Sequence, residues 1–125
     1  MPKNKKKVTP LFKAPTIYDY QAEICSALAN ATRLEILDLL SKKEMTSSEL
    51  LEVLEIPKAN LSQHLAVLKK AGILQSRKEG LYQYESLAIP KIKDACSLVR
   101  SVLMEKMAQD EKHNSLIIKE LKSQR

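Results

Sequence analysis

The chain lacks several features that define whole classes of proteins. Its 125 residues include two glycines, two cysteines, four tyrosines, one phenylalanine and no tryptophan. No apolar run is long enough to cross a bilayer, and the lysine-rich start leads to Pro10 rather than to an apolar signal segment. Two cysteines without a CxxC pair argue against a disulfide scaffold and a zinc ribbon. We therefore expect one soluble cytoplasmic domain with no membrane partner.

Features of an enzyme are also missing. The chain shows no nucleophile–base pair, no carboxylate cluster and no glycine-rich phosphate loop, and it is too short for a large pocket. We expect no catalytic residue, no cofactor and no enzymatic activity. A small domain with so few large side chains often completes its core by dimerising.

The positive charge is unevenly placed. The net charge is +6, and the tail at 1–15, which we expect to be flexible, supplies five of the lysines. Residues 56–84 carry a local charge of +4, whereas residues 44–55 carry −4. Basic charge on one short segment is typical of a nucleic-acid reader, although a solvated charged face would look similar.

That basic segment has a distinctive order of elements. Residues 56–84 read as a helix, a stop, a strand, a tight turn and a second strand. Gly72 and Gly80 stand where the backbone needs positive φ, after the helix and in the turn. A helix backed by a basic hairpin suits the major groove and its surroundings, which indicates a winged helix-turn-helix.

Capping residues and apolar spacing predict the other elements. Thr16 and Asn30 cap two helices, and Thr46 with Glu49 forms a capping box for a short third helix. We expect helices at 17–28, 31–41, 58–71 and 90–108 and strands at 73–77 and 81–86. The fold class is mainly α with a two-stranded β-hairpin. The winged domain should cover residues 16–109, and residues 110–125 should form a tail or a short helix.

The last long helix is apolar over a wide arc. One stripe runs through Ile92, Cys96, Val99, Leu103 and Met107, and a second through Ala95, Leu98 and Val102. This arc is too wide for one packing partner. We expect one side to meet the domain's own core and the other to meet a second subunit.

Three segments resemble the ArsR (ArsR/SmtB) family of repressors. ALANATRLEILDLL at 27–40 is similar to the family's A-L-x-x-x-x-R-L-x-I-L stretch, and ANLSQHLAVLKKAGIL at 59–74 to its recognition-helix signature. SRKEGLYQYESL at 76–87 is similar to its wing. The resemblance implies a homodimer joined by its first and fifth helices, and operator repression relieved by an inducer.

The expected DNA face combines base-reading and backbone-contacting side chains. Asn60 and Gln63 carry amides suited to adenine, and small apolar side chains beside them could meet thymine methyls. The family's S-x-H pair implies Ser62 and His64, with a helix-flank histidine bonded inside the domain as the alternative. Lysines, including Lys69, should attract phosphates, and wing residues should meet the backbone or minor groove. The candidate DNA contacts are Thr46, Ser47, Lys58, Ala59, Asn60, Ser62, Gln63, His64, Lys70, Arg77, Lys78 and Tyr82.

The metal ligands that the resemblance implies are mostly missing. Leu51 and Val53 stand near the place of the family's cysteine pair, and only Glu105 fits its long-helix zinc site. Asp110, Glu111 and His113 could form a weak site but more simply form a solvated segment. We expect no metal site.

The candidate sensors are the thiols of Cys25 and Cys96. They could form a disulfide or polysulfide bridge, or bind arsenite, within or between subunits. The alternative is that both are small core residues. Two further functions stay open: a winged-helix interaction module, and a DNA-binding regulator without a thiol sensor.

Overall fold

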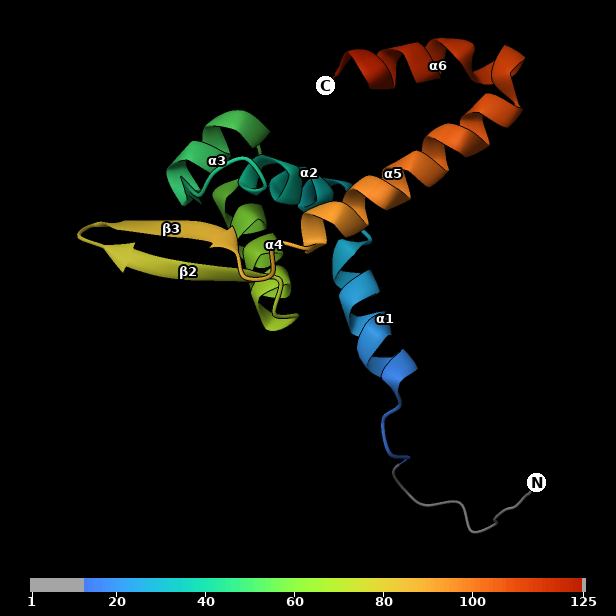
Figure 1. Cartoon of the computed structure of the whole chain (residues 1–125). Helices are drawn as coiled ribbons and strands as arrows, with labels where there is room; N and C mark the ends of the chain where they lie inside the picture. Colours follow the sequence, from blue (N-terminus) through green and yellow to red (C-terminus); the bar gives the residue numbers. More distant parts are fainter. Residues whose placement is uncertain (1–12, 125) are drawn as a thin grey trace.

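The structure, a computed structural model, describes residues 13–124, without the side chains of residues 112–114. Most of the predicted basic tail therefore lies outside the described residues. Figure 1 shows a small helical body with a hairpin on one side and two diverging helices on the other. The elements in chain order are α1 (Ile17–Leu28), α2 (Ala31–Leu40), β1 (Met45–Thr46), α3 (Ser47–Leu54), α4 (Lys58–Lys70), β2 (Leu74–Glu79), β3 (Tyr82–Leu87), α5 (Ile92–Gln109) and α6 (Glu111–Ser123).

The predicted caps start three of the helices. The Thr16 hydroxyl accepts a hydrogen bond from the Asp19 amide, and Asn30 accepts one from the Arg33 amide. Thr46 and Glu49 form a reciprocal capping box at the start of α3. These side chains satisfy amides that have no partner within the helix. The second helix ends at Leu40, one residue before the predicted end.

The two glycines have the predicted backbone conformation. Gly72 (φ +80°) follows α4, and Gly80 (φ +62°) forms the turn between β2 and β3. The strands are β2 at Leu74–Glu79 and β3 at Tyr82–Leu87, each displaced slightly along the chain from its predicted range. Arg77 stands opposite Tyr84 in the antiparallel register.

The sheet has three strands rather than the two that the sequence predicts. β1 pairs antiparallel with β3, which gives the order β1-β3-β2. Met45 and Thr46 are too few residues to show strand periodicity, so the sequence carries no signal for this pairing. β1 fastens the start of α3 to the hairpin.

The core lies beneath α4. Ile36, Leu37 and Leu40 of α2 pack with apolar side chains of α3, α4 and the sheet. The further buried members are Ala27, Met45, Leu50, Leu61, Leu65, Leu68, Ile73 and Leu74. This core supports α4 and the base of the hairpin.

The long α5 is largely unburied in the single chain. Ile92 and Cys96 pack against the core, as predicted for one side of the helix. Leu98 is 67% exposed and Val102 is 59% exposed on the other side. α1 and α5 leave the body opposite the hairpin, and α6 turns back above α5 (Figure 1).

Candidate nucleic-acid interface

One face of α4 is polar and fully accessible. Leu61, Leu65 and Leu68 point into the core, which turns the opposite face outward. All predicted contacts on this helix except His64 are exposed: Lys58, Ala59, Asn60, Ser62, Gln63 and Lys70. Ala66 and Val67 add two small apolar side chains to the same surface. This face presents paired amide donors and acceptors together with methyl groups, which are the chemistry of base edges in the major groove.

His64 is half-buried on the flank of this face and bonded within the domain. Its Nδ1 lies 3.3 Å from Nη1 of Arg33 on α2. The same guanidinium donates from Nε to the Ala27 carbonyl at 2.6 Å and from Nη2 to the Ser26 carbonyl at 3.3 Å. Arg33 thus connects the end of α1 with α4. In the sequence, Arg33 stands out only as part of the family motif, and nothing there indicates this contact.

The predicted contacts at the start of α3 differ in exposure. The Thr46 side chain is buried and its hydroxyl accepts from the Glu49 amide at 3.1 Å, while Ser47 is half-buried. Thr46 therefore uses its side chain as a cap. Amides of the first turn of α3, those of Ser47 and Ser48, are the groups left for an outside acceptor such as a phosphate.

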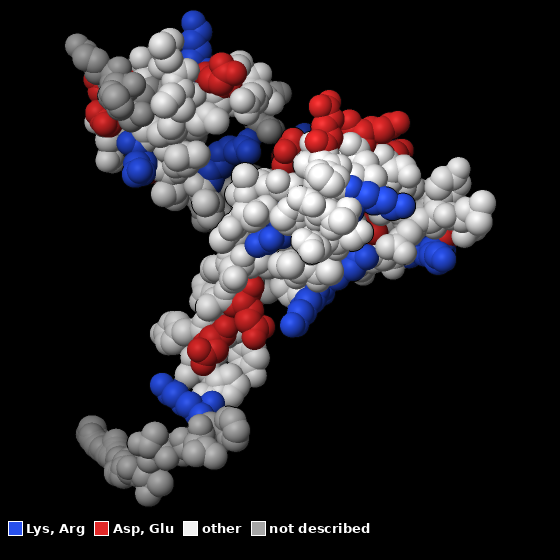
Figure 2. Space-filling model, turned by 180° about the vertical axis from the view of Figure 1, so that it is seen from behind, with Lys and Arg blue, Asp and Glu red and all other residues white. Residues whose placement is uncertain are grey.

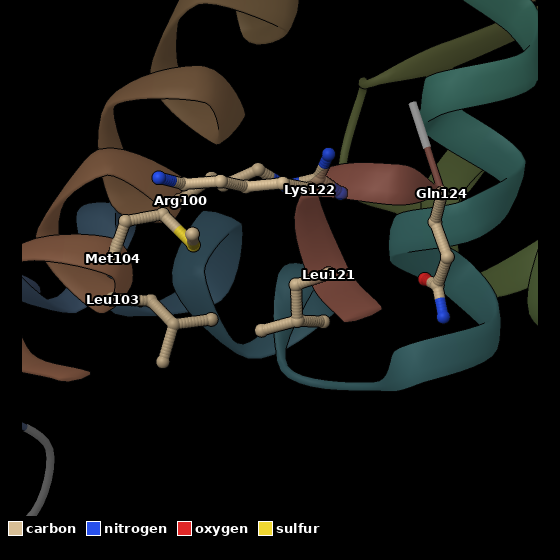
Figure 3. A pocket seen from close by; sticks show the side chains of 6 residues that line it. All are labelled: Arg100, Leu103, Met104, Leu121, Lys122 and Gln124. Carbon is tan, nitrogen blue, oxygen red and sulfur yellow. The ribbon is translucent and has the colours of Figure 1, made fainter. Parts of the chain in front are cut away.

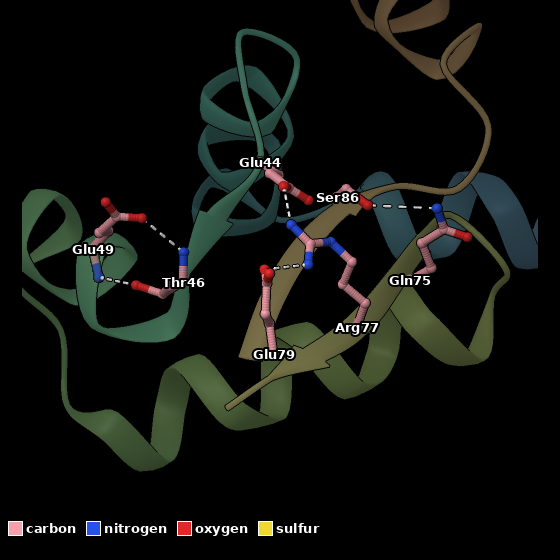
Figure 4. A network of polar contacts seen from close by, with 7 residues as sticks. All are labelled: Glu44, Thr46, Glu49, Gln75, Arg77, Glu79 and Ser86. Carbon is pink, nitrogen blue, oxygen red and sulfur yellow. Dashed lines mark hydrogen bonds and ion pairs between the residues drawn. The ribbon is translucent and has the colours of Figure 1, made fainter. Parts of the chain in front are cut away.

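The wing holds its arginine in an ion-pair network. Arg77 donates from Nη2 to Glu44 at 2.6 Å and from Nη1 to Glu79 at 2.7 Å (Figure 4). Its guanidinium also lies 4.6 Å from the centre of the Tyr84 ring. The hydrogen bonds that Arg77 donates to Glu44 and, second in size, to Glu79 raise the pKa of Arg77, so its charge is permanent but shared with two carboxylates.

Lys78 and Tyr82 lie on the same hairpin as Arg77 but outside its ion-pair network. Both are exposed, and Lys78 makes no ion pair with any residue between 13 and 124. Of the two predicted basic contacts on β2, Lys78 is therefore the one ready to meet a phosphate. Arg77 would first have to exchange a hydrogen bond to Glu44 or Glu79 for one to the phosphate.

A buried carboxylate fastens α4 to the sheet. Glu85 is fully buried; Ser76 donates to its Oε1 at 2.5 Å and Gln83 to its Oε2 at 2.9 Å. Lys69 lies 3.3 Å from the same carboxylate. Lys69, expected to attract phosphates, is thus engaged inside the domain. A buried ion pair needs such additional hydrogen bonds to offset its desolvation.

Basic and acidic side chains occupy opposite edges of the body. Figure 2 shows acidic side chains gathered over α3 and basic ones along the lower edge, from the end of α4 toward the hairpin. On this face (Figure 2) the acidic residues of 44–55 and the basic residues of 56–84 are therefore largely separated, although Glu44 reaches across to pair with Arg77. This separation favours approach of a polyanion from the α4 side.

Cys25 and Cys96 line one groove. It is formed by the end of α1, by α2 and by α5, and its volume is about 1020 Å³. Its lining also includes Asp38, Lys42 and Arg100. Cys25 is exposed and Cys96 is half-buried. Burial raises the pKa of the Cys96 thiol; Arg100 opposes this shift and Asp38 adds to it.

A second, smaller hollow lies between α5 and α6. Leu103 and Met104 face Leu121 across it (Figure 3). It shares Arg100 and Leu103 with the groove, so α6 borders the region between α5 and the body. In the described side chains, no group of three or more His, Cys, Asp or Glu residues could hold a metal ion. No helix within residues 13–124 is long and apolar enough to cross a membrane.

Comparisons with known proteins agree with this geometry. Residues 28–77 match the model of a helix-turn-helix domain family. An HTH-type transcriptional regulator of Methanocaldococcus jannaschii is 37% identical over 83 residues, which are 66% of this chain and 93% of that protein. The transcriptional repressor SdpR of Bacillus subtilis is 33% identical over 72 residues, which are 58% of this chain and 80% of that protein.

A solved structure gives the same fold. It is the homodimeric winged helix-turn-helix DNA-binding domain of a Mycobacterium bovis protein, described as a possible ArsR-family transcriptional regulator. The TM-score is 0.64 at 29% identity, over 74% of this chain and 90% of that chain. The chain is therefore a member of the ArsR family of winged helix-turn-helix transcriptional regulators, and it is not an enzyme.

Proposed function

We propose that the chain binds operator DNA as a homodimer, with α4 in the major groove and the β2–β3 hairpin beside it. The observation that carries the proposal is the outward polar face of α4, held in place by the three buried leucines beneath it. The segregated charge supports the same orientation. An interaction module would instead favour an apolar outer face on α4.

The apolar surface of α5 supports the dimer. Leu98 and Val102 are exposed in the single chain, and the Mycobacterium bovis relative is homodimeric. Two copies would place two recognition helices on one duplex, which allows both half-sites of a symmetric operator to be read.

Base reading is tested by Gln63→Ala. An operator is first selected from a pool of random duplexes, and binding to it is compared with binding to bulk DNA. We expect a loss on the operator equivalent to about 1–3 kcal/mol and little change on bulk DNA. Gln109→Ala, at the exposed end of α5, is the matched control. Equal losses on both DNAs would refute base reading by Gln63.

Backbone contact is tested by Lys78→Gln. Each phosphate contact contributes about 0.9 to the slope of log K against log salt. We expect the variant to flatten that slope by about this amount on operator and bulk DNA alike. An unchanged slope would remove Lys78 from the interface.

We further propose that operator binding represses transcription and that a thiol-directed inducer relieves it. The two thiols line one groove, and the exposed Cys25 is the one open to attack by an outside reagent. Oxidation would join the sulfurs of Cys25 and Cys96 and pass two electrons and two protons to the oxidant. Arsenite would instead bind both thiolates.

A reporter gene controlled by the selected operator tests two points together: whether binding represses transcription, and whether the thiols sense the inducer. Wild type should lower transcription, and arsenite or an organic disulfide should restore it. The double variant Cys25→Ser/Cys96→Ser should still repress but no longer respond. A retained response would leave a regulator without a thiol sensor, and a rise in transcription with wild type would refute repression.

A further inference from the structure

Arg33 occupies a fixed place between two helices. Its guanidinium donates to the carbonyls of Ser26 and Ala27 at the end of α1 and reaches His64 on α4 with its remaining nitrogen. Because the bonds from Nε and Nη2 to two adjacent carbonyls orient the planar guanidinium, its Nη1 is directed toward the imidazole. Arg33 itself is half-buried.

The chemistry of the pair decides where the His64 proton sits. A guanidinium has five N–H donors and no acceptor. Nδ1 of His64, 3.3 Å from Nη1, must therefore be the acceptor and carry no proton. The neutral ring then has its proton on Nε2. Within the described residues no acceptor takes the Nε2–H, so this donor remains for a group outside the domain.

We propose that Arg33 is the positioning residue for His64: it selects the Nε2–H tautomer and presents that N–H to DNA beside Gln63. This inference rests on the proposed function for the identity of the acceptor, a phosphate or a base edge. DNA offers only acceptors at its phosphates, so the donor tautomer is the form that can bond there. The opposite tautomer would present a bare Nε2 to a phosphate oxygen.

The position of Arg33 also ties this donor to α1. Ser26 and Ala27 directly follow Cys25, so the guanidinium is anchored on the turn of α1 that borders the thiol groove. A shift of that turn would move the fork and release Nδ1. The pair therefore joins the two candidate sites through three hydrogen bonds.

The tautomer can be measured in the free protein. In ¹⁵N spectra of the imidazoles, we expect wild-type His64 to show a single neutral Nε2–H form, with the signal assigned by its loss in His64→Ala. Arg33→Lys keeps the positive charge but loses the fork, and it should give a mixture of both neutral tautomers. Wild-type His64 with its proton on Nδ1, or an unchanged Nε2–H form in Arg33→Lys, would overturn the proposal.

Operator affinity provides the second readout. Arg33→Lys should weaken operator binding about threefold to tenfold, the range of one hydrogen bond. In the His64→Ala background the same change should have no further effect, because the coupled partner is gone. An equal loss in both backgrounds would mean a merely structural role for Arg33. If wild type shows no operator preference at all, the proposed function fails, whereas the spectra still decide the tautomer.

Discussion

The α4–hairpin side and the α1–α5 side of the molecule differ in how their apolar surface is covered. α4 buries three leucines against the core and turns polar side chains outward. α5, although longer, has no fully buried residue and leaves Leu98 and Val102 exposed. Apolar surface of this kind on a regular helix marks an interaction site. The α4–hairpin half thus buries its apolar side chains within one chain, whereas the α5 half leaves apolar surface that a second surface could cover.

Charges on the two sides follow the same division. Near α4, Lys69 is paired with the buried Glu85, and Arg77 with Glu44 and Glu79. Along the groove, Lys93 and Arg100 make no ion pair within the described part of the chain. Ion pairs within the domain hold Lys69 and Arg77 on the α4–hairpin side. On the groove side Lys42 pairs with Asp38, whereas Lys93 and Arg100 stay available to solvent, a second subunit or a ligand.

Truncating one leucine on each side should give the largest contrast. Leu68→Ala removes a fully buried side chain beneath α4 and should lower the free energy of unfolding by about 2–5 kcal/mol. Leu98→Ala truncates an exposed side chain of the same size and should cost the single chain less than about 0.5 kcal/mol. Urea unfolding at several protein concentrations measures both.

The concentration dependence tells the two effects apart. The loss in Leu68→Ala should persist at every concentration, because the contact is internal. Any loss in Leu98→Ala should grow only where the dimer forms. An equal, concentration-independent loss in both variants would abolish the contrast between the two sides.

A charge on the exposed side of α5 should separate the subunits without unfolding them. We expect Val102→Asp to sediment as a monomer and to bind the operator about 100-fold more weakly, since the second half-site then no longer binds within one complex. Val53→Asp, at an exposed apolar position of α3, is the control for the added charge. A dimer that survives Val102→Asp would place the interface elsewhere.

Local signals in the sequence predicted most of the fold. Thr16, Asn30 and Thr46 cap helices through bonds to residues three positions away, and Gly72 and Gly80 adopt the positive φ that their places require. Such features depend on neighbours in the chain, so they can be read without knowing the tertiary structure. The polar face of α4 followed from its periodicity in the same way.

The sequence could not show which side chains that are far apart in the chain pair with each other. Arg33 meets His64 across 31 positions, and Arg77 meets Glu44 across 33. In the sequence, Arg33 was part of a family motif, and Arg77 and Glu44 were only charges to be counted. Which charged groups pair depends on how the helices and strands pack, and that packing is not visible in the sequence. The buried state of Glu85 was missed for the same reason. The DNA contacts predicted for α3, α4 and the hairpin stay predictions.

The two thiols should differ in reactivity by several-fold. Cys25 is exposed, whereas Cys96 is half-buried and its pKa is raised mainly by that burial. Because the thiolate is the reacting form, alkylation by iodoacetamide at neutral pH should modify Cys25 first. Mass spectrometry of the time course measures both rates. Faster labelling of Cys96 would contradict the arrangement of the groove.

The raised pKa of Cys96 also predicts a pH dependence. The folded state favours the neutral thiol, so the stability that this group contributes is present below the ordinary thiol pKa. This contribution is lost as the pH rises through the pKa that Cys96 has in the folded state. Cys96→Ser should remove this alkaline loss, and Cys25→Ser should not.

The smallest effect should come from the carboxylate that holds Arg77. Glu44 lies 2.6 Å from the guanidinium and must be released before Arg77 can meet a phosphate. An exposed ion pair of this kind contributes little net free energy, because solvent screens it and holding both side chains in place costs entropy. Glu44→Gln should therefore strengthen DNA binding no more than about fivefold, and it should steepen the salt dependence as Arg77 becomes available.

Glu52→Gln separates this release from a general loss of negative charge. Both variants remove one negative charge. Glu52, however, is exposed on α3 and makes no ion pair in the described residues, so its replacement releases no arginine. In an Arg77→Gln background, the advantage of Glu44→Gln over Glu52→Gln should vanish. If the two variants bind alike in the presence of Arg77, Glu44 acts only as one more negative charge, and Arg77 is as ready for DNA as Lys78.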